Sequence, residues 1–307
     1  MDSTSLYRFR TIVECGSLKK AAARLDLTQP ALTRTLQALE AHYGVELLRR
    51  SSTGVSPTAY GEAVLKRAKL IDAELRNIET DVNALTNVAV GKIYVGAPSG
   101  VAFTSEALPS AARKMLAAAA QIEISCLIAP QHELLSALRQ GALDFVLADL
   151  LHVDQAADLA YEFIFADRGL LVVRDSHPLA NQLRINIGDL MQFPWAVQEV
   201  CKPLENTLLR CGSNFGLTFN KSVFRSNSAL FMRAMVLQCD VVGLLGYDAI
   251  RADLSKGLAV ELPLPTALET ADLPTYRFGI IRRRDSYLSP PAQALIATLT
   301  QLYRRTP

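Results

Sequence analysis

Residues 17–43 constrain the fold more than any other stretch, because they predict two short helices joined by a tight turn at Asp26-Leu27. Ser17 and Thr28 can each cap a helix, since a side-chain hydroxyl accepts from backbone N–H groups that the first turn leaves unpaired. Pro30 falls in the first turn of the second helix, where its missing N–H costs nothing. The apolar residues of that helix recur every three or four positions, which predicts one buried face formed by Leu32, Leu36, Leu39 and Tyr43.

A different face of the second helix is polar and carries Gln29, Pro30, Thr33, Arg34 and Gln37. Arg can bind guanine through two hydrogen bonds, Gln can do the same with adenine, and Thr can contact a thymine methyl group. A short helix that presents such side chains is typical of a helix-turn-helix motif, whose second helix enters the DNA major groove. An ordinary helical hairpin with a solvated outer face would show the same pattern and remains the alternative.

Residues 45–58 are rich in turn-forming residues, which predicts a small two-stranded wing beside the helices. Arg49 and Arg50 lie at its base, where they would contact DNA phosphates. The charge distribution also favours a DNA-binding head. Residues 1–70 contain 11 Lys and Arg against 6 Asp and Glu, whereas the remaining residues carry a net charge of −3.

Residues 58–90 contain no proline and only one glycine, which predicts a long helix. Its apolar residues alternate at spacings of four and three, which is the heptad pattern of a coiled coil. The pattern favours pairing with a second copy of the chain, and a helix packed on its own body is the alternative. The seam consists of Val64, Ala68, Ile71, Leu75, Ile78, Val82 and Leu85.

Composition and motifs limit the cellular compartments and the kinds of chemistry that we expect for this protein. No apolar run is long enough to span a bilayer, and the N-terminus lacks the pattern of a signal peptide, so we expect a cytoplasmic protein without a membrane partner. The sequence contains no catalytic nucleophile motif, phosphate-binding loop or metal-ligand spacing, so we expect neither enzyme activity nor a metal or other cofactor. The odd number of cysteines without a C-x-x-C pair predicts free thiols at Cys15, Cys126, Cys201, Cys211 and Cys239.

After Gly91 the pattern changes to alternating strands and helices, which predicts a largely parallel sheet covered by helices. Two similar α/β units fit this body, with a ligand cleft between them. The first unit is expected to contain strands at 92–97, 122–128 and 144–150 and helices at 102–120 and 132–140. The second is expected to contain strands at 161–165, 169–174, 195–198, 223–225 and 241–245 and helices at 187–191, 204–215 and 228–237; a last strand at 276–283 and helix at 291–304 follow.

The order of these parts resembles that of LysR-type transcriptional regulators. The resemblance is strongest from Phe9 to Gly61, and its most specific element is Thr28-Gln29-Pro30-Ala31-Leu32-Thr33-Arg34 followed by Leu39-Glu40. Asp175-Ser176-His177-Pro178-Leu179-Ala180 also resembles a segment of the family's body. The resemblance implies a winged helix-turn-helix domain (1–61), a linker helix that dimerises (58–90) and a periplasmic-binding-protein-like effector domain (91–307). That domain would comprise one subdomain of residues 91–162 and 269–307 and another of residues 163–268.

The family further implies a homodimer or homotetramer that binds double-stranded promoter DNA and responds to a small effector. The DNA-binding positions carried over are Ser17, Thr28, Gln29, Pro30, Thr33, Arg34, Gln37, Arg49, Arg50 and Thr53. The effector-binding positions are Ser99, Gly100, Pro130, Gln131, Gln198, Ser226 and Asn227. Many members have arginines at the wing tip, where this chain has Thr53-Gly54.

Ser99-Gly100 and Ser226-Asn227 each precede a predicted helix, whose free N–H groups and dipole favour an anion. We therefore expect a polar effector, with an anion favoured, although an uncharged sugar or amide would satisfy the same donors. Two alternatives differ in function. One is a redox-sensing regulator, because Cys201 and Cys211 resemble the placement of the peroxide-sensing pair of the OxyR branch and Lys202 would favour a thiolate. The other is an enzyme with an appended helix-turn-helix.

Overall fold

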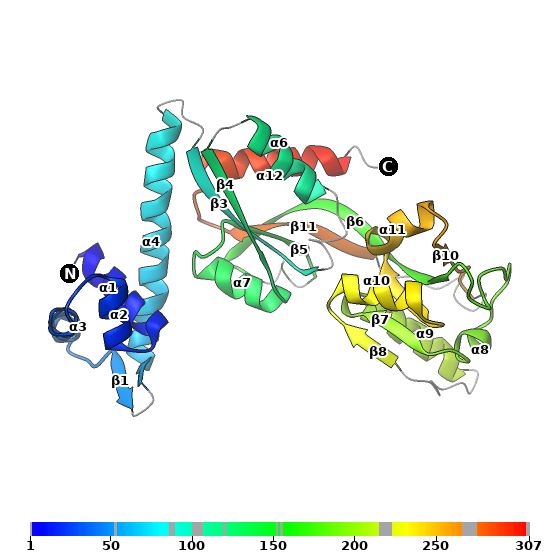
Figure 1. Cartoon of the computed structure of the whole chain (residues 1–307), viewed down its shortest axis with the longest axis horizontal. Coiled ribbons are helices and arrows are strands. Elements are labelled where there is room, and N and C mark those ends of the chain that lie inside the picture. Colours follow the sequence, from blue (N-terminus) through cyan, green and yellow to red (C-terminus); the bar gives the residue numbers. More distant parts are fainter. Residues whose placement is uncertain are drawn as a thin grey trace. The chain divides into compact units, whose positions relative to one another are not determined.

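The computed structural model describes residues 2–51, 54–85, 90–99, 107–118, 121–151, 153, 156–214, 223–265 and 275–304. The chain forms two compact units, which we describe in turn: residues 1–90 with 136–143, and residues 91–135 with 144–307. Figure 1 shows their helices and strands, coloured along the chain. Within the described residues, no helix combines the length and the apolar character that crossing a bilayer requires.

Three helices form the core of the first unit, and their caps lie where the sequence predicts them. Ser17 accepts a hydrogen bond from Lys20 N (3.4 Å), and Thr28 accepts one from Ala31 N (3.4 Å). Asp26, in the turn between the second and third helices, has a left-handed backbone with φ of 52°. The helices are α1 (Ser3–Cys15), α2 (Leu18–Arg24) and α3 (Gln29–Tyr43). Their shared core contains Phe9, Ile12, Ala21, Leu32, Leu36 and Leu39.

The predicted wing is present as an antiparallel pair, β1 (Leu48–Ser51) and β2 (Gly54–Pro57). Val55 N donates to Gly16 O (2.9 Å), which attaches the wing to the end of α1. A Cβ atom on Gly54 would lie 2.4 Å from the same carbonyl oxygen, and the φ of 134° is also unfavourable for other residues. Glycine is therefore required at this point of the wing.

Glu40 fixes the start of the wing. Its Oε1 atom accepts hydrogen bonds from Leu47 N (2.8 Å) and Leu48 N (3.3 Å), and both leucines are buried. We expect Glu40→Ala to lower the free energy of unfolding by about 2 kcal/mol, because two buried N–H groups lose their acceptor. Urea unfolding would measure the change. Glu40→Gln retains an acceptor and serves as the control; equal stability of the Ala and Gln variants would contradict this role.

The long helix α4 (Ala59–Leu85) follows the wing. Val64 and Ala68 pack into the core of the first three helices, which corrects the prediction that the coiled-coil seam begins at Val64. Beyond them the stripe is open: Ile71, Leu75, Ile78 and Val82 are 38, 46, 57 and 55% exposed. Another part of α4 contacts residues 136–143, where Lys69 Nζ lies 2.6 Å from Gln140 Oε1. The helix thus packs partly on its own unit and keeps a free apolar stripe.

The second unit is built on one mixed sheet in the order β4-β3-β5-β11-β6-β9-β7-β8, with β10 paired to β6. Its first α/β part confirms the predicted alternation. The strands are β3 (Val90–Ala97), β4 (Gln121–Ile128) and β5 (Phe145–Asp149), and the helices are α6 (Ala107–Ala118), α12 (Pro290–Arg304) and α7 (Gln131–Arg139), whose residues from Ser136 onward belong to the first unit. In Figure 1, α6 and α12 lie on the same face of this part of the sheet.

Two long strands run through both α/β parts (Figure 1). The two strands predicted at 161–165 and 169–174 are one continuous strand, β6 (Leu159–Arg174). It pairs with β11 (Thr275–Arg283) as far as Arg168 and then with β9, so the polar residues in its middle do not form a turn. Gly279 of β11 allows this close pairing, because a Cβ atom there would lie 2.2 Å from Glu162 O.

In the second α/β part, the sequence did not predict the helix α11 (Tyr247–Ser255) or the short strand β10 (Ala259–Glu261). Trp195 is buried and donates from Nε1 to Leu190 O (3.2 Å), which ties its strand to the preceding helix. The remaining elements are α8 (Ile187–Leu190), β7 (Trp195–Gln198), the 3-10 turn η1 (Glu199–Cys201), α9 (Lys202–Asn214), β8 (Val223–Ser226), α10 (Ala229–Gln238) and β9 (Val242–Gly246).

Candidate functional site

The outer face of α3 is polar and open. Gln29, Pro30, Arg34 and Gln37 are exposed and Thr33 is half-buried, while the leucines of the helix face the core. Within the described residues, the Arg34 side chain makes no hydrogen bond or ion pair, so its guanidinium can bind an external partner. The structure therefore brings together the predicted base-reading residues of this helix on one accessible surface.

The remaining predicted DNA-binding residues lie around α3. Ser17 is half-buried at the start of α2, and Arg49 and Arg50 are exposed on β1. Exposed arginines next to a polar helix face would add contacts to DNA phosphates. Thr53 lies outside the described residues, so its prediction remains untested.

The second unit contains a cavity of ≈ 780 Å³, a volume that suits a small molecule. Five of the seven predicted effector-binding residues line it: Ser99, Pro130, Gln131, Gln198 and Asn227. Gly100 lies outside the described residues. Ser226 is not among the residues that line the cavity; its hydroxyl accepts a hydrogen bond from Ser228 N (3.0 Å).

Two contacts organise the walls of the cavity. The Ser99 hydroxyl, at the end of β3, donates to Asn227 O, at the end of β8, and so links the two α/β parts. Gln131 Nε2 donates to Asp149 O (2.8 Å). Ser228 caps α10 by accepting from Phe231 N (3.3 Å), so the start of this helix is already partly satisfied by its own chain. This weakens the argument from helix dipoles for an anionic ligand.

Sequence reasoning missed a second group of cavity residues, Asp167 and Gly246. The carboxylate of Asp167, a residue of β6, lies next to the start of α11. There the backbone N–H groups of Tyr247 and Asp248 favour its ionised form. Burial has the largest effect and the charge of Asp248 the second largest. Together they outweigh these contacts and raise the pKa of Asp167 to about 6. The sequence feature that could have identified Asp167 is the charged pair Asp167-Arg168 between two apolar runs.

Cys201 lacks the exposure that is typical of a reactive thiol. Cys201 is fully buried, and burial followed by the charge of Asp167 raises the pKa of its thiol far above the usual value. The neighbouring Lys202 therefore does not make it a thiolate, contrary to the sequence-based argument. Cys201 and Cys211 are both free thiols that pack with the core of the second unit.

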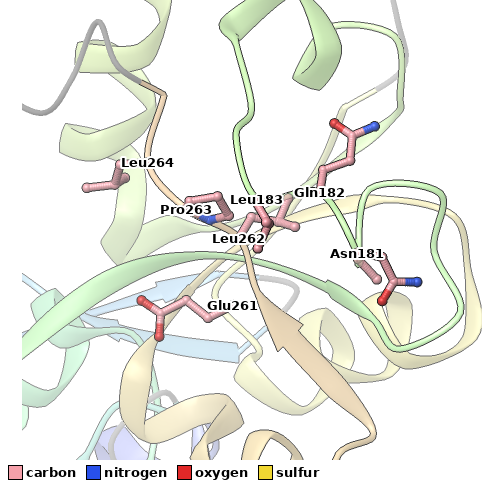
Figure 2. A pocket seen from close by; sticks show the side chains of 8 residues that line it. Asn181, Gln182, Leu183, Glu261, Leu262, Pro263 and Leu264 are labelled. Atoms are coloured by element: carbon pink, nitrogen blue, oxygen red, sulfur yellow. The ribbon is translucent and has the colours of Figure 1, made fainter.

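A second hollow lies beside β10 and has a volume of ≈ 800 Å³. Figure 2 shows Leu183, Leu262 and Pro263 close together, while the amides of Asn181 and Gln182 point away from them. The charged residue of its lining, Glu261, forms a two-point ion pair with Arg168 (2.6 and 3.1 Å). This hollow lacks convergent polar groups, so the cavity at Ser99 and Asp167 is the better ligand site. No cluster of metal-ligating side chains occurs in the described part of the chain.

Comparison with known proteins covers both units. Residues 4–62 match the family of bacterial regulatory helix-turn-helix proteins, lysR family, and residues 87–304 match the LysR substrate binding domain. The HTH-type transcriptional regulator GalR of Pseudomonas putida is 28% identical over 295 residues, which cover 96% of this chain and 72% of that protein. The SDS degradation transcriptional activation protein of a Pseudomonas species is 27% identical over 312 residues, covering 100% of this chain and 98% of the relative.

Solved structures agree on the fold. A full-length OxyR variant from Pseudomonas aeruginosa superimposes with a TM-score of 0.69 at 22% identity, covering 99% of this chain and 95% of that one. At this identity the likeness extends to the architecture alone, and it carries no argument about peroxide chemistry. Since the two family matches together span nearly the whole sequence, the chain belongs to the LysR family of DNA-binding transcriptional regulators.

Proposed function

We propose that the protein binds promoter DNA by placing the outer face of α3 in the major groove. The observation that carries this proposal is the exposed set of Gln29, Arg34 and Gln37 on a helix whose opposite side is buried. Thr33 would contact bases at the edge of this surface, and Arg49 and Arg50 would contact phosphates. Promoter DNA lies in the cytoplasm, and we propose that the protein is located in this compartment.

Fluorescence anisotropy with the DNA upstream of the protein's own gene would test this proposal. Binding should be stronger than to a random duplex of the same length and should weaken steeply with salt, because arginines displace counterions from phosphates. Equal affinity for both duplexes at all salt concentrations would argue against sequence-specific recognition by α3.

We propose that the exposed stripe of α4 pairs with the same stripe of a second copy. The stripe consists of large apolar side chains that are more exposed than is usual for a helix without a partner: Ile71, Leu75, Ile78 and Val82. Pairing would hold two DNA-binding heads at a fixed separation, as recognition of two half-sites requires. We assign residues 1–61 to the DNA-binding domain, 58–90 to the pairing helix and 91–307 to the effector domain.

We propose that a small polar molecule binds in the cavity of the second unit and changes DNA affinity without chemical conversion. The Ser99–Asn227 contact joins the two walls of the cavity, so a ligand that replaces or strengthens it would favour one arrangement of the walls. Such a ligand shifts DNA binding only as far as its affinities for the two arrangements differ.

We expect Ser99→Ala to weaken the effector response by about tenfold, because the link between the cavity walls is lost, while operator affinity without effector stays nearly unchanged. A promoter–reporter assay across a metabolite panel would measure the response. Ser226→Ala is the matched control, since Ser226 does not line the cavity. A normal response in Ser99→Ala would show that this serine does not act in the site.

A further inference from the structure

The polar groups of the cavity indicate the chemical class of its ligand. We infer that the effector carries a cationic nitrogen that pairs with Asp167 and, near it, an oxygen that accepts a hydrogen bond from Gln198 Nε2. This inference rests on the proposed role of the cavity as the effector site. The sequence favours an anionic effector, because Ser99 and Ser226 lie just before predicted helices. A cationic effector differs from that expectation.

The charge of the lining is the first observation. Three carboxylates, Asp149, Asp167 and Glu199, line the cavity, and the described lining includes no lysine or arginine. His132 also lines it, but its side chain is largely exposed to solvent. This lining favours a cationic ligand, which would meet the opposite charge, over an anionic one.

Gly246 brings two of these groups to one point. A Cβ atom on Gly246 would lie 2.5 Å from Asp167 Oδ2 and 4.0 Å from Gln198 Oε1, so both side chains approach the same backbone position. The three residues come from β6, β7 and β9, which are neighbours in the sheet. Glycine at this position leaves the space between the carboxylate and the amide open.

Gln198 supplies a hydrogen-bond donor. Its side chain is only 4% exposed, and its Oε1 atom accepts from Gly246 N (3.2 Å), which determines which end of the amide is oxygen. The Nε2 group at the other end has no partner among the described residues. Because Gln198 lines the cavity, a ligand oxygen there could accept a hydrogen bond from this amide.

Asp167 supplies the charge. Groups from the neighbouring elements face it: Asp248 and Tyr247 of α11 shift its own pKa, and its charge in turn raises the pKa of Cys201 of η1 and of Tyr276 of β11. The guanidinium of the adjacent Arg168 forms its ion pair with Glu261, and the charge of Asp167 has a smaller influence on it. With a pKa of about 6, the carboxyl is ionised at neutral pH despite its burial, and a ligand cation would stabilise that form.

The experiment uses the full chain and a set of matched four-carbon probes. Aminobutanol, butanediol and hydroxybutyrate share a hydroxyl group and differ in the other end, which is cationic, neutral or anionic; butylamine keeps the cation and lacks the hydroxyl. Ligand-observed NMR would give their affinities. We expect aminobutanol to bind about tenfold more tightly than butanediol at about pH 7.5, and butylamine and hydroxybutyrate to bind more weakly than aminobutanol.

Asp167→Asn removes the charge and keeps a side-chain oxygen that can accept from the backbone N–H groups of Tyr247 and Asp248. It should remove the preference for aminobutanol over butanediol, whereas the control Asp175→Asn, at an exposed position, should keep it. In the parent chain the preference should also decline between about pH 7 and pH 5, as Asp167 takes up its proton.

The inference is overturned if hydroxybutyrate binds most tightly, if no cationic probe binds at millimolar concentration, or if Asp167→Asn leaves the preference intact. Operator binding, measured in parallel without any probe, tests the proposed function separately. Normal operator binding together with tight hydroxybutyrate binding would refute the cationic effector and leave the regulator role standing.

Discussion

Ile78→Asp is expected to dissociate the proposed homodimer and to weaken operator binding about a hundredfold, since one carboxylate per chain would face its copy in an apolar seam. Ile78 is 57% exposed in the single chain and lies in the middle of the free stripe of α4. Its replacement removes no atom from the core of the first unit, so the monomer should remain folded. Sedimentation velocity and circular dichroism would measure the assembly and the fold.

Ile78→Val is the control, because it keeps an apolar side chain in the same place and should keep the dimer. A dimer that survives Ile78→Asp with an unchanged dissociation constant would show that the chains pair through another surface. Monomers that still bind the operator as tightly as the parent would show that one head is sufficient.

Arg34→Ala should lower the discrimination between operator and random DNA by about 1–3 kcal/mol, which is the usual contribution of a two-point contact with a base. Arg34 is exposed and makes no interaction within the described residues, so the fold should not change. Anisotropy titrations with both duplexes, at matched salt, would give the two affinities.

Arg34→Lys separates charge from geometry. Lysine keeps the positive charge and therefore most of the non-specific affinity, but it lacks the planar fork that binds guanine at two points. Discrimination should therefore fall in Arg34→Lys nearly as far as in Arg34→Ala. If both variants still prefer the operator as strongly as the parent, Arg34 does not read bases.

The DNA-binding head was predictable because its signals are local. The cap at Thr28, the proline in the first turn and the leucines of α3 all lie within one short segment, and the structure confirms the helix they predict. The seam of α4 was harder to assign. A heptad pattern does not reveal that Val64 and Ala68 pack into the head while Ile71 and later positions stay free.

The effector domain was less predictable where its contacts are distant in sequence. Asp167-Arg168 looks like a break between two strands, but pairing with β11, more than a hundred residues later, keeps β6 continuous. The helix α11 lacks a side-chain cap of its own at Gly246, and its first N–H groups meet Asp167 instead. Both the helix α11 and the cavity residue Asp167 thus depend on contacts between residues far apart in the sequence, which is why the sequence pattern did not predict them.

The continuity of β6 also determines how the effector domain can respond to a ligand. A strand that is hydrogen-bonded through both α/β parts cannot act as a loose hinge, so relative movement of the parts must bend or twist the sheet elastically. A displacement of this kind reverses when the ligand leaves, without refolding of a linker. In deuterium exchange, the amides of β6 that pair with β11 should therefore exchange more slowly than those of an unpaired linker.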